Sequence, residues 1–348
     1  MQKFKAFLKR KDIEFSFKRY FIDALGAMAQ GLFASLLIGT IISTIGQQFG
    51  IEALVTVGTY AKGAQGAAMA VAIGFALKCP PLVLFSLTSV GIAANELGGA
   101  GGAFAVLIIT IIASELGKAV SKETKLDIIV TPIVTICSGI LVAMVIAEPI
   151  GTAAAYVGEL IMYATTLHPF WMGILVSVIV GIALTLPISS AAICAGLSLT
   201  GLAGGAALAG CCAQMVGFAV MSFRENKWGG LLAQGLGTSM LQMGNIVKNP
   251  KIWAAPILTS AIMGPVSTCL FKLEMNGAPV SSGMGTCGLV GQIGTYTGWI
   301  SDGIVPGVFQ WTGLLLTHFV LPAIICWTLG FLFRKIGWIK DGDLKLDL

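Results

Sequence analysis

The chain has 348 residues, of which 56% are hydrophobic and only 11% charged, and its formal net charge is +5. Its mean hydropathy is +0.90. Soluble domains carry about 25% charged residues, so this composition indicates a membrane protein. Polar runs are too short to contain an additional soluble catalytic domain. No Walker sequence is present, which disfavours an ATP-driven pump.

The N-terminus begins with a basic segment over residues 1–20 that carries seven lysines and arginines. The apolar stretch that follows, 21–46, is too long for the core of a signal peptide and lacks a clear cleavage site. We therefore expect a basic amphipathic helix at the membrane surface. A transmembrane domain over 21–335 and a cytoplasmic tail over 336–348 should follow it.

The remaining basic residues fall into short clusters, which should mark the cytoplasmic side together with both termini. These clusters lie at 118–125, 224–227, 248–251 and 334–345. The loops without lysine or arginine should face outward or fold back into the protein. Charge-free or nearly charge-free apolar stretches at 128–147, 252–270 and 309–333 are long enough to cross a bilayer. The sequence predicts an all-α, polytopic membrane protein with about nine to eleven membrane segments.

Two similar polar stretches interrupt the apolar sequence. The first Gly-Thr segment, residues 234–245, reads QGLGTSMLQMGN, and the second, residues 282–292, reads SGMGTCGLVGQ. Amide side chains and loosely wound backbone need polar partners at membrane depth. The first segment lies between two basic clusters and is too short to cross twice, so it should enter and turn back as a re-entrant hairpin. The second should do the same from the opposite face, unless the glycines serve only close packing of ordinary spans.

A weak internal similarity relates residues 132–135 to 256–259, an offset of 124 positions. The two stretches read PIVT and PILT. Many transporters contain such repeats, in parallel or inverted orientation. The match is short enough to arise by chance, and the sequence does not decide between these alternatives.

Acidic residues within the apolar region are few, so each is a candidate for function. Glu96, Glu148 and Glu274 could contact a polar solute or a cation, or they could cap helices. Glu115 is expected to pair with Lys118, three residues on. Ser189 follows a proline break and could line a cavity. His318 lies within a span and is expected to form a packing hydrogen bond.

The sequence contains no pattern typical of a catalytic centre, a metal site or a cofactor site. His168 and His318 are the only histidines, and neither has a nearby acid in sequence. The eight cysteines show no metal-ligand spacing and are expected to be reduced, structural residues. No helix-turn-helix or zinc pattern suggests nucleic-acid binding. We therefore predict no catalytic residue, no metal and no cofactor.

With its two Gly-Thr segments and the Asn276–Gln292 stretch that contains the second, the chain resembles PfoR-like (perfringolysin regulator-like) membrane proteins of the phosphotransferase-system EIIC type 2 family. The basic N-terminus and the LPISS sequence at 186–190 extend the resemblance over essentially the whole chain. The resemblance implies a dimeric carrier of the bacterial inner membrane with an elevator-like transport domain. Separate EIIB and EIIA proteins would supply the phosphoryl group, because this chain has no segment large enough for either domain.

These observations favour a permease that binds and translocates a small polar solute, a sugar or sugar derivative. The alternatives are a membrane solute sensor that regulates gene expression and a proton- or ion-coupled carrier of an organic anion. Amides and hydroxyls suit a polyhydroxylated ligand because they both donate and accept hydrogen bonds. The predicted substrate-binding residues, all polar or acidic, are Gln234, Thr238, Gln242, Asn245, Glu274, Asn276, Ser281, Ser282, Thr286, Gln292, Glu96, Glu148 and Ser189.

Overall fold

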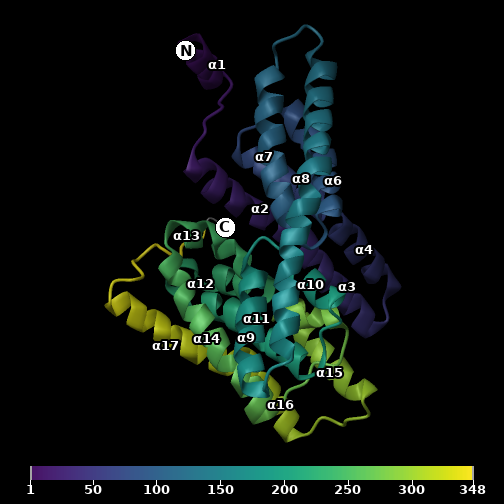
Figure 1. The fold of residues 1–348 in the computed structure, drawn as a ribbon, viewed down its shortest axis with the longest axis vertical. Coiled ribbons are helices and arrows are strands. Elements are labelled where there is room, and N and C mark those ends of the chain that lie inside the picture. The colour runs from purple at the N-terminus through teal and green to yellow at the C-terminus, as the bar shows by residue number, and fades with distance from the viewer. Residues whose placement is uncertain (1, 347–348) are drawn as a thin grey trace. The chain divides into compact units, whose positions relative to one another are not determined.

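A computed structural model describes residues 2–346 of the chain, with side chains from residue 6 onward. The described part is almost entirely helical, and its only extended pairing is a single antiparallel bridge between Gly201 and Met275. The chain divides into two compact units, Met1–Ala153 and Ala154–Leu348. The helices of each unit can be followed by colour along the chain (Figure 1).

The first unit is built from helices that pack mainly against neighbours along the chain. The α-helices are α1 (Gln2–Arg10), α2 (Ala24–Leu32), α3 (Ile38–Phe49), α4 (Glu52–Gly63), α5 (Gln65–Ala76), α6 (Pro81–Gly98), α7 (Gly102–Val120) and α8 (Asp127–Thr165), the last of which continues into the second unit. The short π and 3-10 turns between them are η1 (Arg19–Asp23), η2 (Phe33–Leu37) and η3 (Gly99–Gly101). Helices α3 and α4 pack against each other, and α6 and α7 do so around a turn in which Gly99 has a φ of 49°.

An ion cluster in the first unit forms around the buried side chain of Lys118. Lys118 is only 1% exposed, and its Nζ lies 2.8 Å from Glu115 Oε2, which confirms the expected pairing. Lys118 Nζ also donates to the carbonyl of Leu77, just beyond the C-terminus of α5, and Arg19 Nη2 donates to the same carbonyl at 2.7 Å. A helix C-terminus favours cations, which accounts for the two bonds. Arg19 also bonds Asp12 at 2.8 Å, and this hydrogen bond lowers the pKa of Asp12.

The second unit contains shorter and more interrupted helices. Its α-helices are α9 (Pro169–Thr185), α10 (Ser190–Gly196), α11 (Gly201–Met221), α12 (Phe223–Leu232), α13 (Met243–Lys248), α14 (Ala254–Pro265), α15 (Val290–Ser301), α16 (Val308–Leu315) and α17 (Leu321–Lys335). The π and 3-10 turns are η4 (Ala233–Gly237), η5 (Ser239–Gln242), η6 (Pro250–Trp253), η7 (Val266–Phe271), η8 (Pro279–Gly283), η9 (Cys287–Leu289) and η10 (Leu316–Val320).

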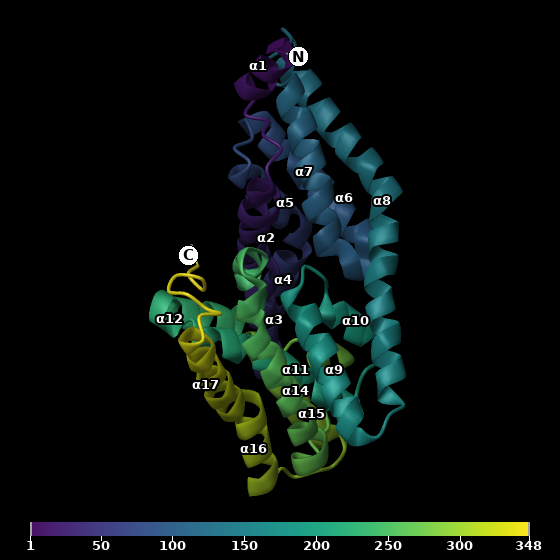
Figure 2. The same cartoon turned by 60° about the vertical axis from the view of Figure 1, so that its left-hand side comes forward.

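Helix α11 forms the core of the second unit, where it lies beside α9 and α14 (Figure 2). Its sequence is rich in glycine, alanine and cysteine, and small side chains let helix backbones approach closely. A Cβ added at Gly210 would lie 1.9 Å from the carbonyl oxygen of Ser177 in α9. Polar side chains join the same helices, since Gln214 Nε2 donates to Ser260 Oγ in α14 at 3.2 Å.

Six helical stretches in the described chain are long and apolar enough to cross a membrane. They are Arg19–Phe49, Pro81–Val120, Asp127–Thr165, Gly201–Met221, Pro250–Phe271 and Val308–Lys335. The three spans expected from the sequence at 128–147, 252–270 and 309–333 each fall within one of these helical stretches. Because α6 and α7 fold back on each other, the second stretch is a helical hairpin rather than one crossing. The chain is thus a polytopic, all-helical membrane protein.

Candidate functional site

The first Gly-Thr segment is a broken helix. Helix α12 continues into the π turn η4, and the helix is then interrupted at Thr238, where φ is −158° and ψ is 143°. The glycines at 235 and 237 weaken the helix before this point. The Thr238 hydroxyl accepts a hydrogen bond from the Met240 backbone N–H at 3.1 Å and so caps the turn η5 that follows.

Three buried amide side chains of this segment bond to one another, and we call them the amide cluster: Gln234, Gln242 and Asn245. Gln242 Nε2 donates to Gln234 Oε1 at 2.9 Å, and Asn245 Nδ2 donates to Gln242 Oε1 at 2.8 Å. Gln234 Nε2 in turn donates to Ser222 Oγ at 2.8 Å. The break in the helix at Thr238 lets Gln234 and Gln242, which are eight positions apart, meet in this way.

The second Gly-Thr segment is also broken, by three left-handed positions within five residues. Gly285 and Gly288 have φ values of 58° and 50°, which glycine adopts without strain, and Leu289 follows at 60° just before α15 begins. The segment is anchored at its start, where Ser282 Oγ donates to the Leu199 carbonyl at 2.7 Å. Ser281 beside it is buried. Both segments therefore interrupt the helical backbone inside the second unit.

The structure brings the two Gly-Thr segments together. The hydroxyl of Thr286, which is fully buried, donates a hydrogen bond to the backbone carbonyl of Gly235. No hydrogen bond within the described chain joins the Thr238 and Thr286 hydroxyls, and the Thr238 hydroxyl accepts from the Met240 N–H of its own segment. Gln292 lies near the same core, with Nε2 donating to Cys212 Sγ at 3.5 Å. Gln292 Oε1 is buried and has no hydrogen-bond partner in the described chain.

A separate cavity of about 120 Å³ lies between residues 271–276, which precede the second segment, and 299–313, which follow it, and combines acidic, basic, amide and aromatic side chains. Asn276 Nδ2 donates to Asp302 Oδ2 at 2.7 Å and to Glu274 Oε2 at 3.1 Å, while Asn276 Oδ1 accepts from the Gly201 N–H at 2.9 Å. Trp299 and Phe309 supply aromatic surface. Carboxylates with aromatic rings are a combination that suits a polyhydroxylated ligand.

Three of the predicted site residues are not drawn into these clusters. Ser189 acts as a helix cap, since its hydroxyl accepts from the Ala192 N–H at 3.1 Å. Glu96 and Glu148 lie in the first unit, and both are exposed, with no hydrogen bond or ion pair in the described structure. The prediction that His318 forms a packing hydrogen bond is wrong, because both of its ring nitrogens are buried without a partner among the described residues.

Sequence reasoning missed several residues that the structure places beside the predicted ones. Asp302 and Trp299 line the cavity with Glu274 and Asn276. The scarcity of acids in the apolar chain could have pointed to Asp302, which lies in a long loop free of lysine and arginine. Ser222 at the amide cluster gave no such signal, because a lone serine between two helices is common.

Comparison with known proteins gives one finding. Residues 22–346 match the family model described as "Phosphotransferase system, EIIC". No curated protein and no solved structure matches the chain.

Proposed function

The chain belongs to the phosphotransferase system EIIC family, and from this premise we propose that it translocates its sugar at the junction of the two Gly-Thr segments. The family and the apolar helices together make the chain an integral-membrane sugar permease. The observation that carries the proposed location is the contact of Thr286 with the Gly235 carbonyl. It joins two broken helices that are distant in sequence.

Free helix ends at such a junction present backbone N–H and C=O groups to a solute. Neutral amides and hydroxyls around them suit sugar hydroxyls. Gln292 Oε1 is a buried acceptor without a partner among residues 2–346, and we propose that it accepts a hydrogen bond from the sugar. The cavity at Glu274, Asn276 and Asp302 would bind the sugar before it reaches the junction. In this proposal the two Gly-Thr segments are re-entrant elements.

We further propose that separate EIIB and EIIA proteins phosphorylate the sugar and that the chain works as a homodimer with an elevator-type movement. The basic clusters near both termini favour a cytoplasmic location for the two ends, in the bacterial inner membrane. An EIIB protein would then approach the side of the membrane that carries the C-terminus.

Counterflow in proteoliposomes tests the proposed function. Purified protein is reconstituted without other phosphotransferase proteins, the vesicles are loaded with an unlabelled sugar, and uptake of the same labelled sugar is followed. Glucose, mannose, galactose, N-acetylglucosamine, mannitol and sorbitol form the panel. Transient accumulation of at least one of them is the expected result.

The other functional classes give different outcomes in the same assay. A solute sensor would show saturable binding of a sugar without flux. A proton-coupled carrier would transport an organic anion only when a proton gradient is imposed, and it would transport no sugar of the panel. Either outcome would overturn the proposal.

A further inference from the structure

The C-terminal tail, residues 336–346, packs against the second unit and does not extend freely from it. Two of its apolar side chains are buried, Leu344 at 0% and Ile339 at 2% exposure. Tight turns shape the chain between them, and Asp343 Oδ2 accepts a hydrogen bond from the Lys340 N–H at 2.8 Å. A surface tail of this composition would ordinarily leave its leucine in solvent, so this tail has a specific docking site.

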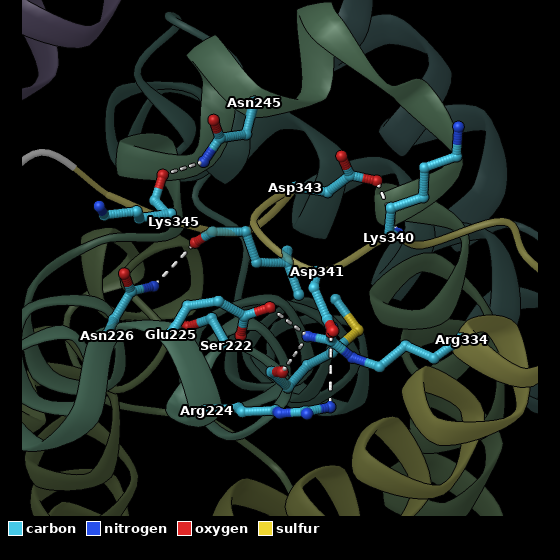
Figure 3. Close-up of polar contacts among 12 residues, drawn as sticks. Ser222, Arg224, Glu225, Asn226, Asn245, Arg334, Lys340, Asp341, Asp343 and Lys345 are labelled. Atoms are coloured by element: carbon cyan, nitrogen blue, oxygen red, sulfur yellow. Dashed lines mark hydrogen bonds and ion pairs between the residues drawn. The ribbon is translucent and has the colours of Figure 1, made fainter.

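The docking site is the amide cluster. Gln242 Nε2 donates to the Leu344 carbonyl at 3.0 Å, and Asn245 Nδ2 donates to the Lys345 carbonyl at 2.8 Å. Asn226 Nδ2 also donates to the Leu344 carbonyl at 2.8 Å (Figure 3). Asn226 Oδ1 accepts from the Leu346 N–H, also at 2.8 Å. The tail backbone thus takes up donors that the amide cluster would otherwise offer to another polar molecule.

Charged side chains fix the base of the tail. Arg334, at the end of α17, lies 2.7 Å from Glu225 in α12, and both side chains are largely buried. Asp341 of the tail lies 3.2 Å from Arg334 and 3.4 Å from Arg224 (Figure 3). Asn249, just after α13, donates to Asp343 Oδ2 at 2.8 Å. The tail is therefore held from both ends of the first Gly-Thr segment, at α12 and beyond α13.

A continuous set of contacts connects the tail to the junction of the two segments. The Leu344 carbonyl binds Gln242, and Gln242 binds Gln234. Gln234 is followed directly by Gly235, whose carbonyl receives the Thr286 hydroxyl. The docked tail thus supplies hydrogen-bond acceptors to two amide side chains of the first segment. If the tail leaves, two buried amides lose acceptors, and the segment must find new ones.

We propose that the C-terminal tail is a latch. While docked, it covers the amide cluster and holds the first Gly-Thr segment against Thr286. On release, it opens the cluster to water and polar solutes. The latch rests on the proposed function in one respect, that the amide cluster belongs to the solute path. That the tail covers the amide cluster follows from the tail contacts alone.

The test measures access to position 245, which lies directly under the tail. An Asn245→Cys protein loses one bond to the tail but keeps those from Asn226, Gln242 and Asn249. It is treated with a water-soluble maleimide, and peptide-resolved mass spectrometry follows the labelling rate at position 245. The rate is compared in the intact tail, in Leu344→Ala and in Asp343→Ala. Lys345→Ala is the matched control, because its side chain is exposed and unbonded while its carbonyl remains in place. Cys212, which is fully buried, reports global unfolding in the same samples.

The latch predicts slow labelling with the intact tail and with Lys345→Ala. Leu344→Ala and Asp343→Ala should each raise the rate at least about tenfold while Cys212 stays unlabelled, since each loosens the tail and not the core. Equal rates in all four proteins would overturn the proposal. If Leu344→Ala also exposes Cys212, the surface change Asp343→Ala decides the matter. The labelling assay needs no solute and no flux. Equal labelling rates would therefore contradict the latch without contradicting the permease, whereas absent counterflow would contradict the permease without contradicting the tail contacts.

Discussion

Thr286 and Gln292 illustrate how polar side chains are used inside this membrane protein. The Thr286 hydroxyl donates to a backbone carbonyl of the other Gly-Thr segment. The side-chain carbonyl oxygen of Gln292 has no hydrogen-bond partner among the described residues. The apolar context of the sequence pointed to both residues, because amides and hydroxyls are costly to bury at membrane depth and usually serve a function there. Their partners could not be predicted. Thr286 bonds the Gly235 carbonyl, while Thr238 caps its own segment.

Replacing Thr286 with valine keeps the shape of the side chain and removes its hydroxyl. The Gly235 carbonyl then loses a donor in a buried place, which costs about 1–3 kcal/mol. We expect the melting temperature in detergent to fall by several degrees. Thr328→Val is the control, since Thr328 is exposed and bonds only within its own helix. Equal melting temperatures for the two variants would contradict the assigned contact.

Asp12 links the N-terminal segment to the ion cluster of the first unit. The hydrogen bond from Arg19 holds the pKa of Asp12 below its ordinary value, so the folded state binds this proton less readily than the unfolded state. The stabilisation is present above the ordinary pKa, about 4, and is lost as the pH falls through the lowered value.

The melting temperatures of the wild type and Asp12→Asn, measured across the pH range, should therefore differ most at neutral pH. The difference should shrink below about pH 4. A difference that grew on acidification would show that the ion pair does not form as described.

Among the elements, α11 and the two broken segments differ in how well the sequence predicted them. The glycine-rich Gly-Thr segments were recognisable as interruptions, because glycine and polar residues do not sustain a lipid-facing helix. The docking of the tail was not recognisable, since Leu344 and Asn226 lie 118 positions apart and carry no pattern. The central position of α11 could be predicted from the small residues on all its sides. The identity of the helices that pack against it could not.

Gly210 tests the packing of α11. A Cβ at this position would lie 1.9 Å from the Ser177 carbonyl oxygen, so α9 and α11 would have to move apart. Gly210→Ala should lower the free energy of unfolding by about 1–3 kcal/mol. Gly196→Ala in α10 is the control, because a Cβ there meets nothing within 4 Å. Thermal melting of the two variants measures the difference, and an undisturbed Gly210→Ala protein would contradict the close approach of α9 and α11.

At the scale of the whole molecule, hydropathy predicted the membrane class and the positions of the long spans. Each expected span at 128–147, 252–270 and 309–333 lies within an observed helix. The count of nine to eleven segments and the orientation of the termini stay predictions, as does the elevator movement. Charge asymmetry indicates orientation only statistically, and short broken helices such as α12 and α13 have no hydropathy signature of their own.

Counterflow with variants of the junction measures the central claim most directly, that a sugar crosses the membrane where the two Gly-Thr segments meet. Proteoliposomes containing the wild type, Gln292→Ala or the exposed control Gln48→Ala are compared with the sugar that gives the strongest signal. The wild type and Gln48→Ala should accumulate the labelled sugar transiently, and Gln292→Ala should lose about tenfold or more of the initial rate, because a sugar hydroxyl loses its acceptor. Undiminished counterflow in Gln292→Ala, or none in the wild type with any sugar of the panel, would contradict the account.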